Sequence, residues 1–215
     1  MQLAGRPLVE WSIAALRAAR GVRSIVVACP PGHVHELGGG DLGVVDGGAT
    51  RARSVANALE AVGTELVAIH DAARPLLTPE LVEGVLATLA EDPDAAGVIA
   101  ATPVTDTIKQ ASAGPSPGIL QLSTPHGGEK AAIDVVSTVD RSLLWAAQTP
   151  QVFRVEALRR ALAADPAAVE AATDEAMLVE AAGGRVLVHP APPENLKVTT
   201  PLDLRVAELL LAARS

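Results

Sequence analysis

The sequence has few of the residues on which several classes of protein depend. It contains one cysteine, Cys29, which excludes an internal disulfide framework and a zinc site made of several cysteines, and which fits a reducing compartment. It has no tyrosine, one phenylalanine and two tryptophans, so a surface that stacks bases or sugars on aromatic rings is a poor hypothesis. No apolar run reaches the roughly 18 residues of a membrane-spanning helix. Residues 1–6 lack the basic-then-apolar layout of a secretory signal, so we expect a cytoplasmic protein without a membrane partner.

Positive charge is also scarce. The chain has 17 lysines and arginines against 25 acidic residues, a net charge of −8, which argues against a nucleic-acid partner bound through overall positive charge. A local basic pocket for phosphates remains compatible with this balance, although only three lysines are present, Lys109, Lys130 and Lys197. Because 49% of the 215 residues are apolar, we expect a sizeable core in one large domain or two small ones.

Short β-branched runs alternate with segments of helical periodicity along most of the chain. The expected strands are Ser24–Cys29, Gly43–Asp46, Leu66–His70, Ala95–Ala101 and Val186–His189. The expected helices are residues 7–19, a helix N-capped by Ser54, one opened by Thr78-Pro79, residues 155–164, one opened by Thr173, and one opened by Thr200-Pro201. In the last of these helices, Leu202, Val206, Leu209 and Leu210 share a face. This alternation predicts an α/β fold with a mainly parallel sheet and helices on both faces.

Two features interrupt this pattern. Residues 110–130 hold several Gly, Pro and Ser without periodicity, and they are too many for an ordinary connection, so we expect a lid, an arm or a partner-binding element there. A doubly wound domain normally begins with a strand that carries a phosphate-binding turn at its carboxyl end, whereas this sequence begins with a helix. We therefore expect a first strand and its loop to be missing from the sequence.

Candidate ligand-binding residues are those that follow the expected strands, because ligands of open α/β sheets bind beyond the carboxyl ends of the strands. The segment Asp46–Ser54 has two glycines that allow close approach of a ligand, but a tight turn with a helix cap is the favoured reading from spacing alone. Asp71 could hold a metal or a ribose hydroxyl, and Arg74 could reach an anion. Equally, Asp71 could be a helix cap and Arg74 an ordinary surface residue. His70 is more simply a satisfied core residue than a catalyst.

Further candidates lie later in the chain. They are Thr105–Thr107, Thr138–Arg141, Gln148–Gln151 and Asn195–Thr199. Nothing in the spacing of Asp106 and Asp140 supports a carboxylate pair for acid–base chemistry. Lys197, between apolar neighbours, is explained by snorkelling to solvent or, more specifically, by an anionic ligand.

Taken in order, these segments resemble a known family. The succession VDGGATRARSV, HDAARPLLT, TPVTDTIK, TVDRSLLWAAQTPQVF, TDEAMLVEAAGG and ENLKVTTPLDL is similar to the 2-C-methyl-D-erythritol 4-phosphate cytidylyltransferases over essentially the whole chain. TVDR followed by TPQ-x-F is the most specific part. Ribitol-5-phosphate cytidylyltransferases are similar around HDA-x-RP and TPQ, which keeps another polyol phosphate open as the substrate.

The resemblance implies a reaction, a fold and partners. Members transfer a cytidylyl group from CTP to methylerythritol phosphate, release pyrophosphate and use Mg²⁺ in non-mevalonate isoprenoid precursor biosynthesis. The implied fold is a Rossmann-like nucleotidyltransferase fold with a protruding dimerisation arm, here residues 105–147, exchanged between the subunits of a homodimer. A phosphate monoester is already a nucleophile at pH 7, so charge stabilisation and positioning supply the catalysis, and no Ser–His pair is required.

The same resemblance assigns roles to individual residues. For CTP it implies the loop residues Gly47, Gly48, Arg51 and Ser54, with Gly48 and Ser54 on the cytosine, and Asp71 and Ala72 along the ribose and phosphates, with Asp71 near the metal. For the sugar phosphate, it implies that Arg74 and Thr107 reach the substrate from the partner subunit. Arg141 and Thr149 would position the phosphate of this substrate. Lys197 would bridge that phosphate and the α-phosphate of CTP. Arg141 and Lys197 are the implied catalytic pair.

Two departures from the family concern the nucleotide site. The family has Asp after the second glycine, where this chain has Ala49. The family also opens with a strand, an AAG-x-G-x-R loop and a PK pair, and Met1–Pro7 matches the stretch after that lysine. We therefore expect residues 1–215 to be a single cytidylyltransferase domain lacking its first strand and phosphate loop, with Met1 an internal methionine of a longer natural chain. A weakly active binding or dimerisation module is the alternative, whereas an oxidoreductase would need G-x-G-x-x-G after a first strand.

Overall fold

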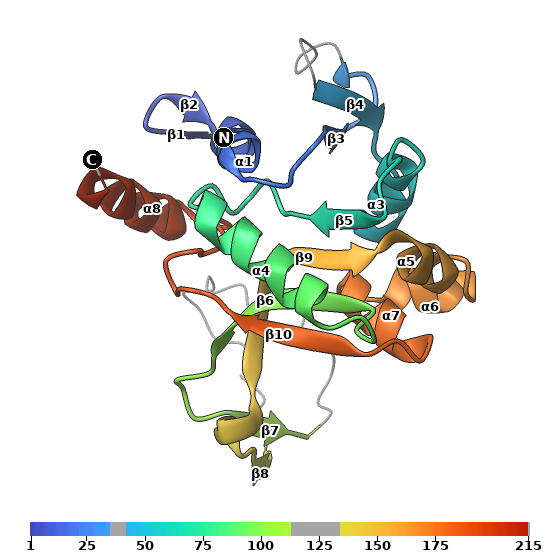
Figure 1. The fold of residues 1–215 in the computed structure, drawn as a ribbon. Helices are drawn as coiled ribbons and strands as arrows, with labels where there is room; N and C mark the ends of the chain where they lie inside the picture. The colour runs from blue at the N-terminus through green and yellow to red at the C-terminus, as the bar shows by residue number, and fades with distance from the viewer. Residues whose placement is uncertain (35–41, 113–133, 215) are drawn as a thin grey trace. The chain divides into compact units, whose positions relative to one another are not determined.

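The computed structural model describes residues 1–34, 42–112 and 134–214, which form two compact units. The larger unit comprises Met1–Thr102 and Ala147–Ser215, and the smaller comprises Pro103–Ala146. Figure 1 labels their helices and strands. The expected arm, residues 105–147, corresponds closely to the smaller unit, although much of the aperiodic stretch 110–130 lies outside the described residues.

Besides a short hairpin at residues 2–7, the larger unit contains a four-stranded sheet and a separate two-stranded one. The four-stranded sheet has the order β10 (Val186–Pro190), β6 (Gly97–Pro103), β9 (Trp145–Arg154) and β5 (Leu66–Ile69). The two-stranded sheet pairs β3 (Ile25–Cys29) with β4 (Leu42–Asp46). The pairs β3–β4 and β10–β6 are parallel, as expected, whereas β5–β9 is antiparallel. The sheet is therefore mixed at β9, a strand that the sequence did not predict.

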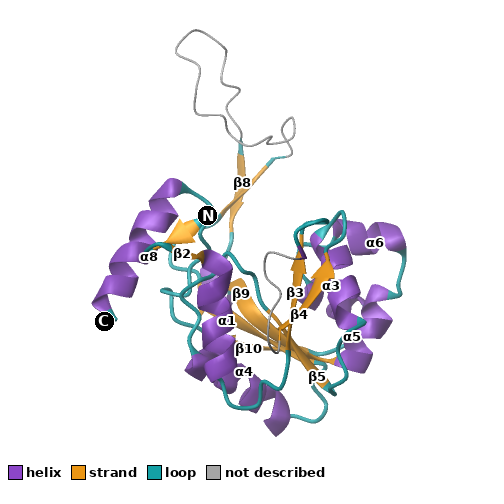
Figure 2. Ribbon diagram, turned by 90° about the horizontal axis from the view of Figure 1, so that it is seen from above, coloured by secondary structure: helices purple, strands orange, loops and turns teal. Residues whose placement is uncertain are grey.

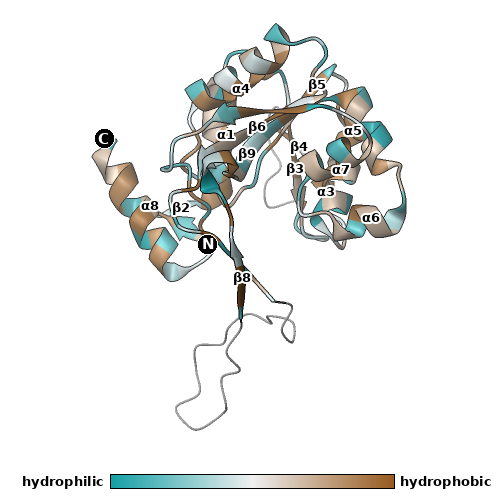
Figure 3. Cartoon of the chain, turned by 90° about the horizontal axis from the view of Figure 1, so that it is seen from below, coloured by the Kyte–Doolittle hydropathy of each residue, from teal (hydrophilic) through white to brown (hydrophobic). Residues whose placement is uncertain are grey.

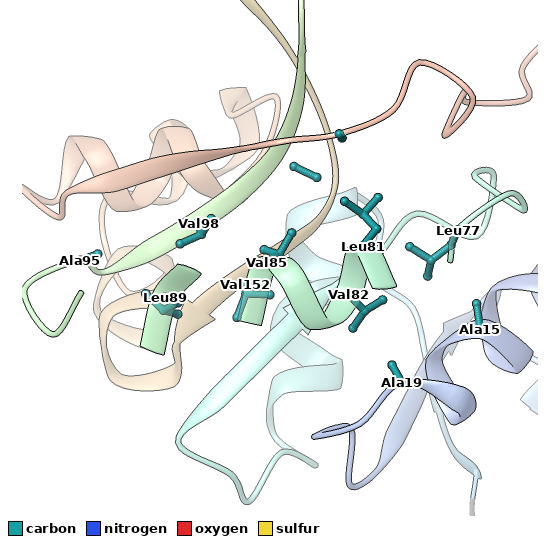
Figure 4. Packing of buried hydrophobic residues seen from close by; sticks show 12 residues of the cluster. Ala15, Ala19, Leu77, Leu81, Val82, Val85, Leu89, Ala95, Val98 and Val152 are labelled. Atoms are coloured by element: carbon teal, nitrogen blue, oxygen red, sulfur yellow. The ribbon is translucent and has the colours of Figure 1, made fainter. Parts of the chain in front are cut away.

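Helices cover both faces of the four-stranded sheet, as the sequence predicts (Figure 2). One face packs on α1 (Leu8–Ala18) and α4 (Pro79–Glu91), and the other on α3 (Arg51–Leu59), α5 (Val155–Leu162), α6 (Pro166–Ala171) and α7 (Glu175–Ala181). Because strand side chains alternate, Val152 joins the first core cluster and its neighbour Phe153 the second. Figure 4 shows Val98 and Val152 beside the α4 residues Val85 and Leu89.

A third cluster joins the C-terminal helix to the start of the chain. The helix α8 (Pro201–Ala213) begins with a capping box, in which Thr200 Oγ1 accepts from the Asp203 N–H and Asp203 Oδ2 accepts from the Thr200 N–H. Hydrogen bonds from Thr199 and Thr200 lower the pKa of Asp203 to about 2. The inner face of α8 packs against Leu3 of β1 (Gln2–Leu3). The strand β1 pairs with β2 (Arg6–Pro7).

The four residues of α8 that were expected to share a face do not form its buried face. Leu202, Val206 and Leu209 are exposed, and much of the α8 ribbon is coloured brown, for hydrophobic residues, in Figure 3. Ala207 is the buried residue, with Leu204 and Leu211 packed beside it. The helix is apolar on more than one side, so periodicity could not choose between its faces.

The N-terminus of α3 also differs from the prediction. Thr50, not Ser54, is the N-cap: its backbone is extended and its side chain accepts from the Arg53 N–H. Ser54 lies one turn inside the helix, where its hydroxyl donates to the Thr50 carbonyl. The helix therefore begins at Arg51, which places this arginine at the carboxyl end of the strands.

The strands β3 and β5 have no ladder between them, and a cavity of about 1010 Å³ is lined by both. Apolar residues of α1 and α3 contribute to its wall, and Arg51, Asp71 and Lys197 also line it. All four residues of β5 are only partly buried, whereas β6, which has neighbours on both sides, is largely buried. The space between β3 and β5 is therefore a largely apolar cavity.

The smaller unit is built on a short antiparallel pair. Within its described residues, β7 (Lys109–Ala111) pairs with β8 (Val135–Thr138), and the 3-10 turn Arg141–Leu143 follows. Val135 and Val136 of β8 are 61% and 62% exposed, and Leu143 is 81% exposed. In this unit, apolar side chains are therefore presented to the surface rather than gathered into a core.

Candidate active site

The loop that follows β4 is held tightly closed on the start of α3. The Gly47 N–H donates to the Cys29 carbonyl at 2.7 Å, and the Gly48 N–H donates to Ser54 Oγ at 3.0 Å. A Cβ on Gly48 would lie 2.3 Å from Cβ of Arg53 and 2.9 Å from its backbone carbon, so only glycine fits there. The two glycines thus keep the loop backbone close to the carboxyl end of β4, and the hydrogen bond to Ser54 fixes the position of the Gly48 amide.

Four charged side chains from distant parts of the sequence form one chain of ion pairs. Arg51 Nε lies 3.1 Å from Asp71 Oδ1, and Lys197 Nζ lies 2.9 Å from Asp71 Oδ2. Arg51 Nη1 also donates to the carboxylate of Glu175 at the start of α7. The order is Glu175, Arg51, Asp71, Lys197, so Asp71, directly beyond the end of β5, is held between two cations.

The surroundings of these groups favour their charged forms to different degrees. Burial alone would raise the pKa of Asp71, but Lys197 and Arg51 more than offset it and hold the pKa below its usual range. Burial raises the pKa of Glu175, and Arg51 offsets only part of this effect. Burial would lower the pKa of Arg51, but Glu175 and then Asp71 raise it. Asp71 is therefore a stable anion, and Arg51 a stable cation, at neutral pH.

His70 and Thr149 lock the backbone on which Asp71 stands. His70 Nε2 lies 3.1 Å from the Arg74 carbonyl oxygen, which can only accept, so Nε2 carries the proton and Nδ1 is an acceptor. Thr149 Oγ1 therefore donates to His70 Nδ1 at 3.0 Å while it accepts from the Asp71 N–H at 3.1 Å. Burial lowers the pKa of His70 to about 4, in agreement with this neutral tautomer. His70 is a satisfied interior residue, as the sequence favoured.

Arg74 is a cation held by backbone carbonyls. Its Nη1 donates to the Asn195 carbonyl at 2.8 Å, two residues before Lys197. Asn195 is buried, and its amide donates to Gln148 Oε1 and to the Thr149 carbonyl, both at 2.8 Å. Burial lowers the pKa of Arg74, and Asp71 offsets part of that effect. This network fixes Arg74 near the segment that carries Lys197, so two of the three cations expected to bind phosphates lie on one connected network.

The remaining predicted residues are placed less specifically. Ala72, beside Asp71, lines the cavity. Thr107 and Arg141 belong to the smaller unit, where Arg141 Nη1 donates to the Thr105 carbonyl. Their role toward substrate, and that of the Thr149 hydroxyl already bonded to His70, stay predictions.

A divalent cation fits this site through one carboxylate. Among the described residues there is no group of three or more His, Cys, Asp and Glu side chains suited to a metal. Mg²⁺ is commonly held by one or two carboxylates together with substrate phosphates, so the ionised Asp71 is compatible with it. A metal ligand bond at Oδ2 would require Lys197 to move away from Asp71.

Three residues support the site in ways that the sequence analysis did not assign. They are Glu175, whose side chain is 1% exposed, Asn195 and Gln148. Gln148 and Asn195 lie in segments that the sequence did single out, but as candidates for ligand contact. For Glu175 the only signal was an acid next to Asp174, which reads as an ordinary first-turn residue; its partner Arg51 is 124 residues away.

The described part of the chain has no helix long and apolar enough to cross a membrane.

The family model of 2-C-methyl-D-erythritol 4-phosphate cytidylyltransferase matches residues 1–213. The enzyme of that name from Symbiobacterium thermophilum is 42% identical over 95% of this chain and 75% of its own length. The one from Rubrobacter xylanophilus is 38% identical over 100% of this chain and 87% of its own.

Solved structures agree with the sequence relatives. The crystal structure of the Thermus thermophilus cytidylyltransferase of the same name is 33% identical, with a TM-score of 0.76 over 98% of this chain and 92% of that one. The match extends through both units, and it confirms the expected nucleotidyltransferase fold. The chain belongs to the 2-C-methyl-D-erythritol 4-phosphate cytidylyltransferase family.

Proposed function

We propose that this chain transfers a cytidylyl group from CTP to 2-C-methyl-D-erythritol 4-phosphate in isoprenoid precursor biosynthesis. A phosphate oxygen of the sugar attacks the α-phosphorus of CTP, the bond between the α-phosphorus and the bridging oxygen breaks, and pyrophosphate leaves. The single observation that carries the proposal is the Asp71 carboxylate held between Arg51 and Lys197 beyond the end of β5. This arrangement supplies cations where two phosphates must meet, in a chain of the matching family.

Each residue has a distinct task in this mechanism. Lys197 leaves Asp71 to bridge the sugar phosphate and the α-phosphate, and it lowers the repulsion between the two anions. Arg74, fixed by the Asn195 carbonyl, reaches the sugar phosphate bound by the other subunit of the proposed dimer, and Arg141 adds a further cation to the sugar phosphate. The loop Gly47–Gly48 and Ser54 select the cytosine by close backbone approach. No group needs to remove a proton, because the attacking phosphate is already ionised.

The test is pyrophosphate release by the purified chain. We expect release only when CTP and methylerythritol phosphate are both present. Ribitol 5-phosphate in place of methylerythritol phosphate tests the alternative acceptor, and we expect at least about ten-fold lower kcat/KM with it, the scale set by one or two lost hydrogen bonds. Equal or faster turnover of ribitol 5-phosphate would contradict the assignment of the acceptor.

Mg²⁺ is the proposed cofactor. It would be held by Asp71 together with the phosphates of CTP, and it would neutralise charge that develops on the leaving pyrophosphate. Removal of divalent cations with a chelator should abolish turnover, and added Mg²⁺ should restore it. Full activity in excess chelator would contradict this cofactor.

A homodimer through the smaller unit is the proposed assembly. Val135, Val136 and Leu143 there are exposed apolar side chains, as expected of residues that a partner subunit covers. Val136→Lys should lower the mass measured by light scattering to that of one chain. Leu202→Lys on α8, equally exposed, is the matched control and should leave the mass unchanged. A wild-type mass of one chain would contradict the dimer.

The single buried Cys29 fits a cytoplasmic location, testable by cell fractionation.

We also propose that residues 1–215 form a domain whose sheet is completed by one further strand between β3 and β5. The support is the cavity of about 1010 Å³ lined by both strands, which lack a ladder to each other. A strand there would pair with both neighbours, and the loop after it would open toward Asp71 and Arg51. Extending the chain upstream in the same reading frame should raise the melting temperature and tighten CTP binding. An extended chain with the same melting temperature and CTP affinity would contradict this proposal.

A further inference from the structure

Asn195 carries a buried side-chain amide, with 1% of the residue exposed. Its Nδ2 donates to Gln148 Oε1 and to the Thr149 carbonyl oxygen, both at 2.8 Å. Because a carbonyl oxygen only accepts, Nδ2 must face Thr149, and the orientation of the amide is fixed. Asn195 Oδ1 is then buried without a hydrogen-bond partner among the described residues. An unsatisfied buried acceptor costs free energy and offsets part of what the two donated bonds contribute, so stability alone does not explain this amide.

The Asn195 amide closes a ring of contacts around the charged cluster. The Asp71 N–H donates to Thr149 Oγ1, and the Thr149 carbonyl accepts from Asn195. Two residues beyond Asn195, Lys197 Nζ lies 2.9 Å from Asp71 Oδ2. Thr149 in β9 therefore holds both sides of the ion pair: the backbone of Asp71 through its hydroxyl, and the segment that carries Lys197 through its carbonyl.

Residues 195–198 are attached to two different elements. The Val198 N–H donates to the Ala73 carbonyl at 2.7 Å. Arg74 Nη1 donates to the Asn195 carbonyl at 2.8 Å, so both bonds tie the segment to the turn after β5. Within the part of the chain that the structure describes, the hydrogen bonds from this segment to β9 come from the Asn195 side chain alone. Without this amide, the segment would keep its attachment to the turn and lose its attachment to β9.

Lys197 reaches Asp71 on a long flexible stem, so the position of its ammonium depends on where its backbone is held. We infer that Asn195 is a positioning residue for cytidylyl transfer, which fixes the backbone before Lys197 to β9 and so keeps the ammonium where the two phosphates meet. This inference rests on the proposed function for its catalytic consequence, but the geometry it describes exists without substrate. In Asn195→Ala, Lys197 is still present but is no longer held at one distance from Asp71.

Lysine reactivity reports on this positioning in the substrate-free chain. The sequence has three lysines, so labelling by an amine-acylating reagent can be assigned by peptide mass spectrometry. The side chain of Lys197 is 45% exposed, and its bond to Asp71 slows its reaction. Lys109, whose Nζ donates to Thr138 Oγ1 in the smaller unit, is the internal reference. We expect the ratio of Lys197 to Lys109 labelling to rise about three-fold in Asn195→Ala, because the charge-assisted bond to Asp71 is formed less of the time.

A double-variant cycle in kcat separates positioning from a general structural role. Asn195→Ala should lower kcat for pyrophosphate release about ten-fold, with KM for CTP changed less than about three-fold, because the lysine is misplaced at the reacting phosphates. In the Lys197→Gln background, the same substitution should lower kcat by less than about two-fold further, because the group that it positions is gone. Asn57→Ala is the matched control, since Asn57 Nδ2 also donates to a backbone carbonyl, that of Asp46, at 2.9 Å. Its effect on kcat should be the same in both backgrounds.

Three results overturn the inference. One is an unchanged labelling ratio in an Asn195→Ala chain that melts as a folded protein. Another is a rise in labelling without a fall in kcat. The third is an equal fold-loss of kcat with and without Lys197, which would mean that Asn195 acts only on the stability of the fold. If Asn195→Ala does not fold, Asn195→Ser keeps one donor for the Thr149 carbonyl, and we expect smaller changes in the same directions; the absence of both changes would overturn the inference.

A failure of the proposed function has a different signature. A wild-type chain that releases no pyrophosphate contradicts that function, whereas the labelling ratio of Asn195→Ala still tests whether the amide holds Lys197. A rise in the ratio there supports the geometry, and an unchanged ratio overturns it.

Discussion

Strands β5 and β6 have similarly apolar sequences and opposite surroundings. β6 lies between β10 and β9 and is largely buried, whereas β5 pairs only with β9 and all its residues are partly exposed. β5 is also the strand that ends at Asp71, with Lys197 and Arg51 beside it. The comparison teaches that this unit separates its tasks: β6 contributes to the core, and the half-open β5 side carries the charged cluster to which we assign the chemistry.

The largest effect should follow from removing a cation on the β5 side. Lys197→Gln should lower kcat/KM for cytidylyl transfer about 10²–10³-fold, the scale of one lost donor at a developing charge. Lys109→Gln, in the smaller unit, is the matched control and should change it less than about three-fold. Steady-state pyrophosphate release measures both. Equal losses in the two variants would break the proposed separation of tasks.

The next effect concerns pH and the histidine at the end of β5. Because the pKa of His70 falls to about 4 in the folded chain from 6.5, its contribution to stability is complete above pH 6.5 and is lost as pH falls toward 4. The loss amounts to about 3 kcal/mol if the full shift is realised. Urea unfolding between pH 4 and 7 measures it, and His70→Gln should flatten the profile. A profile that His70→Gln leaves unchanged would rule out this residue as its source.

The same substitution in the two strands sharpens the comparison further. Val98→Ala in β6 removes a side chain that is 0% exposed, so it should lower the free energy of unfolding by about 2 kcal/mol. Val67→Ala in β5 removes a partly exposed one and should cost less than about 1 kcal/mol. Urea unfolding at pH 7 compares them. A larger loss in Val67→Ala would show that β5 is as tightly packed as β6.

The smallest and most local effect is in amide exchange. Amides of β5 that do not pair with β9 should exchange at least about ten-fold faster than those of β6, because no second strand covers them. Hydrogen exchange followed by mass spectrometry resolves the two peptides. Equal protection would indicate that the open edge of β5 is covered in solution.

The strands and helices of regular pattern could be predicted from the sequence, and the rest depended on long-range contacts. The runs around Val26, Val67 and Val98 are β-branched and apolar, so strands were predicted there. The strand β9 was missed because it contains the polar residues Gln148 and Gln151, which are buried by tertiary hydrogen bonds. Local pattern cannot show that such residues will find partners.

The candidate site was likewise only partly predictable. Asp71 was predicted to follow a strand and Lys197 was singled out between apolar neighbours, and the structure brings the two side chains together. The burial of Glu175 could not be predicted, because an acid at the start of a helix is usually exposed and its partner Arg51 comes from the opposite half of the sequence. The role of His70 required its tautomer, which only the carbonyl of Arg74 reveals.

Asp71→Asn offers the most direct test that the charged cluster beyond β5 is the catalytic centre. The amide preserves the shape of the side chain and removes the charge that Arg51 and Lys197 hold. Pyrophosphate release from CTP and methylerythritol phosphate should fall at least about 100-fold, while the melting temperature changes by only a few degrees. Turnover within a factor of about three of wild type, in a variant with a native melting curve, would contradict the account.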